Sequence, residues 1–309
     1  MARSPRSLCT FAAAALLLAG CGGSDGGAES ADAVRPAEPP AEQPQPSPAE
    51  PVEPTPEVPS GPQDAPPPDP AEPHEPPADP AAPVASVPAD RLDLASWKLT
   101  LPVDTPHAGA PDEIRQPELA TFALEPFFAL TAAKDGVSFR APIEGATTSS
   151  SGYPRSELRE MSADGSDGAS WSTTSRTHTL EIRQAITHLP EVKAHVVAGQ
   201  IHDADDDVIM IRLEGEHLFV EGGGEELGTL DGHYVPGRIF TVKIVAGGGR
   251  IRVDYDGVPK LDIARAASGC YFKAGAYTQS NVAKGDAPGA YGEVVIYDLR
   301  IRTRNGVRR

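Results

Sequence analysis

The 309-residue sequence has few cysteines, few aromatic residues and a deficit of positive charge. Its three cysteines, Cys9, Cys21 and Cys270, are too few and too scattered for a disulfide framework or a zinc site. Lysine and arginine total 27 against 44 acidic residues, so the formal net charge is −17. So acidic a chain is unsuited to nucleic acid as its main partner, because phosphates require a basic surface. No uninterrupted apolar run reaches the length of a membrane-spanning helix.

Proline and acidic residues are concentrated near the N-terminus. Of the 33 prolines, 21 lie within residues 21–90, and residues 22–90 hold 14 acidic side chains against the single basic residue Arg35. Such a segment cannot bury enough apolar surface to offset its chain entropy, so residues 21–90 are predicted to form a disordered, extended linker. Residues 91–309 have a more ordinary composition and are long enough to form one domain with a sizeable core.

The first 20 residues have the pattern of a signal peptide. Arg3 and Arg6 precede a short apolar stretch over residues 8–19. That stretch ends in Leu-Ala-Gly-Cys at Cys21, which resembles the lipobox of bacterial lipoproteins. The resemblance implies removal of residues 1–20 and lipidation of Cys21. We therefore expect an outer-membrane lipoprotein of a Gram-negative bacterium, facing the periplasm or the cell surface; ordinary secretion is the alternative.

Residues 91–309 contain short runs in which apolar and polar residues alternate, separated by Gly, Pro and Asp. Five such runs begin at Thr179, Val208, Phe240, Arg250 and Glu293. Alternation with a period of two predicts antiparallel strands, and Asp256-Gly257 is a plausible hairpin turn. One weak helical candidate lies at residues 117–123. The pattern predicts an all-β fold of two antiparallel sheets, a β-sandwich or jelly roll.

Arg155-Ser-Glu-Leu-Arg159 is unusual for a sandwich strand. In a strand, Arg155, Glu157 and Arg159 share one face. Two guanidinium groups on either side of a carboxylate suit the binding of carboxylates in fork geometry. A solvated ladder of surface charges is the alternative interpretation of this segment.

Two further segments place polar groups on one strand face. Gln200 and His202 form one such face, and the other comprises Tyr271, Lys273, Gly275, Tyr277 and Gln279. The glycine leaves room for a ligand to approach the backbone. A structural histidine and an exposed aromatic ladder remain alternatives. If all three segments formed neighbouring strands of a concave sheet, they would build a cationic groove suited to an anionic polymer.

These segments also carry a family resemblance. Arg-Ser-Glu-Leu-Arg at 155–159, Gln-Ile-His at 200–202 and Tyr-Phe-Lys-Ala-Gly-Ala-Tyr-Thr-Gln at 271–279 resemble the signature blocks of the polysaccharide lyase family 7 alginate lyases. Trp-Lys-Leu-Thr-Leu-Pro at 97–102 resembles the usual N-terminal strand of that family. The resemblance implies a β-jelly roll with the active site on its concave sheet. It also implies cleavage of alginate by β-elimination, without a cofactor or metal, by a chain that we expect to be a monomer.

The resemblance further implies roles for individual residues. The residues that match catalytic positions are Arg155, Gln200, His202 and Tyr277. The first three would neutralise the substrate carboxylate, and His202 would also be the base for guluronate. Tyr277 would protonate the leaving oxygen and, for mannuronate, also abstract the proton. Residues expected to bind substrate or support the site are Glu157, Arg159, Tyr271, Lys273 and Gln279. Among these, Glu157 is expected to orient the two arginines, and Arg159 and Lys273 to lower the pKa of Tyr277. Ile201 is associated in the family with guluronate-containing substrates.

Three alternatives can be weighed on the sequence. A retaining glycoside hydrolase needs two carboxylates about 5–5.5 Å apart, and no strand with Glu and Asp in alternation over four residues occurs in 91–309. A non-catalytic module that binds an anionic polysaccharide would need aromatic residues but not His202 beside Tyr277. The acidic run at 203–207 lacks the glycine and terminal glutamate of a calcium loop, so a solvated turn is the preferred interpretation.

Overall fold

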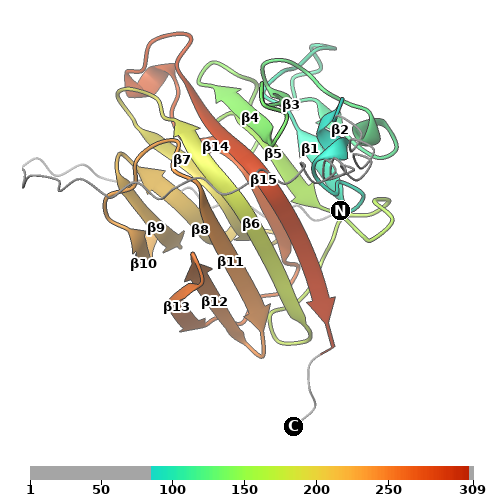
Figure 1. The fold of residues 1–309 in the computed structure, drawn as a ribbon, viewed down its shortest axis with the longest axis vertical. Coiled ribbons are helices and arrows are strands. Elements are labelled where there is room, and N and C mark those ends of the chain that lie inside the picture. The colour runs from blue at the N-terminus through green and yellow to red at the C-terminus, as the bar shows by residue number, and fades with distance from the viewer. Residues whose placement is uncertain (1–84, 306–309) are drawn as a thin grey trace, which may run out of the picture. The chain divides into compact units, whose positions relative to one another are not determined.

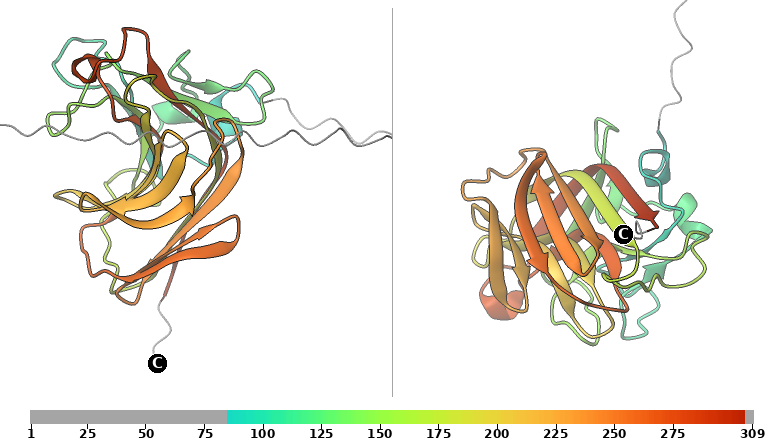
Figure 2. Two further views of the ribbon diagram at one scale, coloured as in Figure 1. Left: turned by 90° about the vertical axis from the view of Figure 1, so that its left-hand side faces the viewer. Right: turned by 90° about the horizontal axis from the view of Figure 1, so that it is seen from below.

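The computed structural model describes residues 85–305, and these form two antiparallel β-sheets that face each other (Figure 1). Both sheets are strongly curved, as Figure 2 shows. The predicted signal peptide, the lipidation site at Cys21 and most of the predicted linker lie outside the described residues. The prediction of an all-β sandwich of two antiparallel sheets is confirmed.

The first sheet has eight strands. Their order across the sheet is β10 (Glu225–Asp231), β9 (His217–Gly222), β8 (Asp207–Glu214), β7 (His195–His202), β14 (Tyr271–Thr278), β5 (Arg155–Glu160), β1 (Trp97–Thr100) and β2 (Glu113–Ile114). Neighbours in this order that are far apart in the sequence, such as β7, β14 and β5, are brought together by the connections that cross between the sheets.

The second sheet has seven strands. Their order is β13 (Val258–Ala264), β12 (Arg250–Tyr255), β11 (Phe240–Gly247), β6 (Thr177–His188), β15 (Tyr291–Arg304), β4 (Val137–Pro142) and β3 (Phe128–Leu130). Strand β15 packs behind β14, so the two long central strands of the sheets face each other.

Strand alternation in the sequence corresponds to burial in the structure. In β6, Leu180 and Ile182 are fully buried between the sheets, whereas Thr179 and Glu181 lie on the outer face. All five alternating runs predicted as strands lie in β6, β8, β11, β12 and β15. The turn at Asp256-Gly257 joins β12 to β13, and both residues have the positive φ angles that such a tight hairpin requires.

Helical structure is limited to three short 3₁₀ turns in the part of the chain that the structure describes. They are η1 (Pro88–Asp90), η2 (Glu118–Ala120) and η3 (Val282–Lys284). The helical candidate at 117–123 is therefore only one turn long. Its leucine, Leu119, is buried and anchors the turn to the core. No helix within residues 85–305 has the length and apolar character needed to cross a membrane. Cys270 is a buried free thiol, and burial raises its pKa to about 11.

Candidate active site

The three unusual segments lie on neighbouring strands, β5, β14 and β7, with β14 between the other two. Their registers align the polar side chains in rows. Lys273 is paired with Arg159 on one side and with Gln200 on the other. At the two ends of β14, Tyr277 is paired with Arg155 and Tyr271 with His202.

These side chains open into a cavity of about 390 Å³ on the outer face of the eight-stranded sheet. Eight of the nine residues predicted for the site line it: Arg155, Arg159, Gln200, His202, Tyr271, Lys273, Tyr277 and Gln279. The ninth, Glu157, does not line the cavity, and its side chain is only 1% exposed. It lies beneath the cavity floor, so it is placed to position other residues and not to bind substrate directly.

Glu157 connects three groups of the floor. Its carboxylate accepts a hydrogen bond from the Gln200 amide, and it lies 2.7 Å from Lys273 Nζ and 3.3 Å from Arg155 Nη1. Burial alone would raise the pKa of Glu157, but the charges of Lys273 and Arg155 outweigh burial and hold that pKa below its usual value. The carboxylate therefore stays ionised and keeps the two cations and the amide in place.

Lys273 is the most deeply desolvated cation of the site, with a side chain 9% exposed. Burial lowers its pKa to about 8, against the opposing attraction of Glu157. Near neutral pH the ammonium group is still protonated, so the floor presents a positive charge that little water screens.

His202 is positioned to accept a proton. Its Nδ1 lies 2.7 Å from the backbone carbonyl oxygen of Asp203, which makes Nδ1 the donor and leaves Nε2 unprotonated. The ring stacks on Tyr271, with centroids 5.4 Å apart, and the Tyr271 hydroxyl oxygen lies 3.1 Å from the same Nδ1. Burial lowers the pKa of His202, and the charges of Lys273 and Arg155 lower it further. The imidazole is therefore neutral at neutral pH.

Tyr277 is held by Ser151 and Arg155. The Ser151 hydroxyl exchanges a hydrogen bond of 2.8 Å with the phenol oxygen, and the Arg155 guanidinium lies 4.0 Å from the ring centroid. Arg155, and not the predicted Arg159, is therefore the arginine beside the tyrosine. The register of β14 determines this, because it pairs Tyr277 with Arg155.

The predicted pairing of Glu157 with both arginines is half right. Arg159 turns away from Glu157, donates to the carbonyl oxygen of Glu160 at 2.9 Å and lies 3.9 Å from the Tyr271 ring centroid. Lys273 takes the place expected for Arg159, because its side chain projects from the strand next to Glu157 and reaches the carboxylate directly.

The structure requires glycine at position 275 for a reason different from the one expected. Its φ is +134°, and a Cβ atom would lie 2.5 Å from the carbonyl oxygen of Ser156 on the neighbouring strand. The pairing of β14 with β7 is irregular between Ala274 and Tyr277. The glycine thus allows close approach of two strands at a bulge, and not the approach of a ligand.

The cavity also contains residues that sequence reasoning did not assign to the site. They include Lys98, Thr100, Glu113, Ser150, Ser151, Met210 and the acidic residues Asp205, Asp206 and Asp207. Lys98 and Glu113 form an ion pair. At the His202 end, burial and the neighbouring Asp206 charge raise the pKa of Asp207 to about 6. The floor is therefore cationic, as expected, while parts of the rim are acidic.

The acidic run at 203–207 forms a turn. The Asp203 carboxylate accepts hydrogen bonds from the backbone N–H groups of Asp205 at 2.9 Å and of Asp206 at 3.0 Å, and these bonds stabilise the turn. Among residues 85–305, no three His, Cys, Asp or Glu side chains gather in a way that could hold a metal ion.

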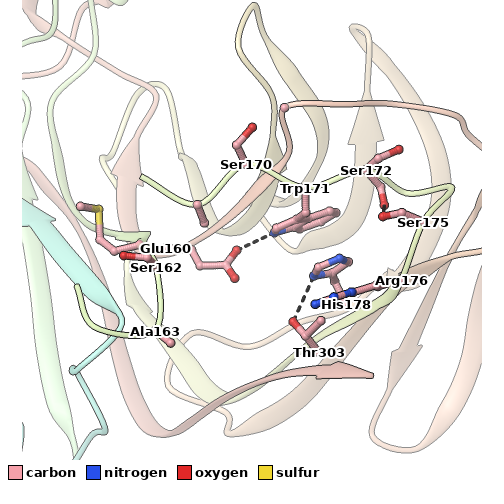
Figure 3. Close-up of a pocket in the computed structure, with 13 residues that line it drawn as sticks. Glu160, Ser162, Ala163, Ser170, Trp171, Ser172, Ser175, Arg176, His178 and Thr303 are labelled. Atoms are coloured by element: carbon pink, nitrogen blue, oxygen red, sulfur yellow. Dashed lines mark hydrogen bonds between the residues drawn. The ribbon is translucent and has the colours of Figure 1, made fainter. Parts of the chain in front are cut away.

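A larger cavity, of about 600 Å³, lies where β5 ends and β6 begins, and Figure 3 shows its lining. The Trp171 indole N–H donates a hydrogen bond of 2.8 Å to the Glu160 carboxylate, and its ring stacks on His178 with centroids 4.3 Å apart. The Thr303 hydroxyl forms a hydrogen bond of 3.2 Å with Nδ1 of the same histidine. These polar groups are bonded to one another and connect the two sheets. None of the nine predicted site residues lines this cavity.

Comparison with known proteins gives one consistent result. Residues 92–303 match a family model described as alginate lyase. An alginate lyase from Klebsiella pneumoniae is 28% identical over 289 residues, which cover 72% of this chain and 92% of that protein. The solved structure of alginate lyase AlgAT5, from polysaccharide lyase family 7, is 58% identical with a TM-score of 0.69 and covers 71% of this chain and 99% of its own. An alginate lyase from Corynebacterium sp. is 49% identical with a TM-score of 0.67, over 70% and 97% of the two chains.

Proposed function

This chain belongs to the alginate lyase family, and from this membership we propose that it cleaves its 4-O-linked uronate polymer by β-elimination, leaving an unsaturated uronate at the new end. It is thus a polysaccharide lyase, and a purely non-catalytic binding module is set aside. The observation that supports the mechanism is the convergence of Arg155, Gln200, His202 and Tyr277 on one cavity.

The chemical difficulty lies at C5 of the uronate. This carbon is next to an ionised carboxylate, so removal of its proton creates an unstable dianion. Preorganised donors that neutralise the carboxylate lower that barrier. The floor supplies such donors in the Arg155 guanidinium and the Gln200 amide, both held by the buried Glu157. Because these donors are fixed before substrate binds, little reorganisation is needed during the reaction.

Proton transfer is divided between two residues. His202, neutral and with Nε2 free, is suited to act as a base, and the Tyr277 hydroxyl is suited to give a proton to the leaving oxygen. Mannuronate and guluronate differ in configuration at C5, so their protons leave on opposite sides of the ring. Tyr277 then serves as base and acid for mannuronate, whereas guluronate uses His202 as base and Tyr277 as acid only.

The direct test uses the purified full chain and alginate. Elimination predicts rising ultraviolet absorbance from the new double bond and products with unsaturated ends. Products with saturated ends would indicate hydrolysis and would refute the proposed mechanism.

The proposal includes a preference for guluronate-containing blocks. It rests on the resemblance of the Gln-Ile-His block, because Ile201 is fully buried and cannot itself touch the substrate. Initial rates on block-purified polymers test it, with His202→Ala as the diagnostic variant. We expect His202→Ala to reduce the rate on polyguluronate more than on polymannuronate. A native protein that cleaves only polymannuronate would contradict the preference.

The proposed location is the outer membrane, with a lipid on Cys21. It is supported by the lipobox-like sequence before Cys21 and by the proline-rich segment that separates this cysteine from the lyase domain. A tether of this kind would keep the enzyme near incoming polymer while leaving the cavity accessible. The protein would act there as a monomer.

A further inference from the structure

A second cationic groove lies on the sheet that does not carry the active site. It runs along β6 on the outer face of the seven-stranded sheet and encloses about 230 Å³. Its lining, called here the arginine groove, consists of Thr177, Thr179, Glu181, Lys243, Val245, Arg300, Arg302 and Arg304. It holds four cations and one carboxylate, in a chain whose formal net charge is −17.

The registers of three strands place these side chains in a regular array. On β15, Arg300, Arg302 and Arg304 are paired with successive outward residues of β6, namely Glu181, Thr179 and Thr177. Alternate residues of a strand are separated by roughly 7 Å, so the arginines form an evenly spaced wall beside a floor with two hydroxyl groups. Lys243 of β11 stands on the other side of the floor, opposite Glu181.

Most of this charge is not neutralised locally. Arg300 is bound to Asp298 at 2.9 Å. Within residues 85–305, no carboxylate oxygen lies within 4.0 Å of a charged nitrogen of Lys243, Arg302 or Arg304. All three arginines of the groove are exposed. A polyanion that enters the groove would therefore meet free, solvent-facing guanidinium groups.

We propose that the arginine groove is a second binding site for the polyuronate chain, separate from the catalytic cavity. A linear polyuronate carries one carboxylate on every sugar, which suits a regular row of arginines, and its hydroxyl groups suit the threonine floor. This inference rests on the proposed function only for the identity of the polymer.

The acidic N-terminal segment fits the groove less well. Between residues 22 and 84 the acidic residues are three to eight positions apart and are mostly separated by proline and alanine. Such irregular spacing does not match a wall in which a cation recurs at every second residue. Occupation by this segment is therefore treated as an outcome that would refute the proposal.

Two sites on opposite sheets would make the enzyme bivalent. One segment of polymer could stay in the arginine groove while another enters the catalytic cavity, so that each release from the cavity is followed by rapid rebinding at high effective concentration. The benefit applies to long chains that reach both faces and not to short oligomers.

The test is a calorimetric titration of the full chain with a saturated alginate hexamer, in a Tyr277→Phe background so that ligand is not consumed. We expect two hexamers per chain. The double variant Lys243→Glu/Arg302→Glu should lose one of them, with that affinity weakened roughly tenfold or more at low ionic strength. The matched control is Lys134→Glu/Lys260→Glu, which makes the same charge change at two exposed lysines outside the groove lining. Thermal unfolding checks that all variants are folded.

The outcomes separate the two proposals. If the groove variant binds as many hexamers as its parent, or if the control loses a site equally, the second site is refuted. A second site that appears only after the acidic residues of 22–84 are changed to amides would show that this segment occupies the groove in the native protein. That outcome also refutes the proposal. Failure of the proposed lyase chemistry shows instead in the absorbance assay, which does not depend on the arginine groove.

Discussion

Replacing Glu157 with Gln removes the negative charge beneath the floor of the candidate active site. The carboxylate is 1% exposed and holds two cations whose side chains are 9% and 10% exposed, Lys273 and Arg155. Breaking a buried ion pair by removing one partner costs about 3–5 kcal/mol, because the remaining charge stays desolvated. For a domain of this size, that loss corresponds to a decrease in Tm of roughly 6–20 °C.

The loss should depend on pH in a defined direction. Burial lowers the pKa of Lys273 to about 8 while Glu157 is present. Without Glu157, the pKa of Lys273 in the folded variant falls further. Above that pKa the unfolded chain binds more protons than the folded variant, so the stability of the variant increases as pH rises. The native protein gains in this way only above about pH 8. The deficit of Glu157→Gln is therefore largest at low pH and shrinks by up to about 1.4 kcal/mol per pH unit between the variant's Lys273 pKa and pH 8.

Chemical denaturation of the full chain at several pH values between 6 and 9 measures this dependence. The matched control is Glu113→Gln, at the cavity edge, whose carboxylate is 38% exposed and also pairs with a lysine, Lys98. Solvent screens the Glu113 carboxylate more than that of Glu157, although Lys98 itself is 13% exposed, so this control should lose less stability than Glu157→Gln. A Glu157→Gln deficit below about 1 kcal/mol, or one that stays constant from pH 6 to 9, would refute the account of a compensating buried charge.

Four further predictions follow from the site and the sequence. Tyr277→Phe should reduce the initial rate on both polymannuronate and polyguluronate by at least about 10²-fold while leaving oligomer binding intact; substantial residual cleavage would show that the acid is misassigned. Activity should fall at acidic pH only below the usual pKa range of histidine, because burial lowers the pKa of His202. Activity should also fall above about pH 8, where Lys273 loses its proton, and Lys273→Arg should move this alkaline limit upward. An alkaline limit that this substitution leaves unchanged would exclude Lys273 as its source. Excess chelator should leave the initial rate unchanged, and a loss of rate that calcium restores would assign a function to the acidic turn at 203–207. Cys21→Ser should move the protein from the membrane to the soluble fraction with unchanged kcat, and persistence in the membrane fraction would disprove the lipid anchor.

The face that each functional residue occupies could be predicted from the sequence, but its neighbours could not. Alternation alone places Arg155, Glu157 and Arg159 on one side of a strand, whatever strand lies beside it. Which of the arginines reaches the carboxylate depends on the register of β14, more than 100 positions further along the chain. That register pairs Lys273 with Arg159, so that its ammonium group reaches the Glu157 carboxylate diagonally, and no local pattern in residues 155–159 contains this information.

The residues that sequence reasoning missed lie in loops or at sheet edges. Ser151 belongs to a loop without periodicity, so nothing in its neighbourhood predicts the hydrogen bond to Tyr277. Glu113 is half of a two-residue strand, too short to give an alternating pattern. In both cases the side chain reaches the cavity through tertiary contacts that only the folded chain defines.

Net charge illustrates the same limit from the opposite direction. A value of −17 argues against nucleic acid as the main partner, yet the family to which the chain belongs acts on a polymer that is itself an anion. The two facts agree because affinity for a polyanion depends on the local field within about a Debye length and not on the sum over the chain. Here Arg155 and Lys273 form part of the cavity floor, while 14 of the acidic residues lie within residues 22–90. An anionic polymer at the floor is therefore attracted by nearby cations. Water and salt screen these cations far less than they screen the distant carboxylates.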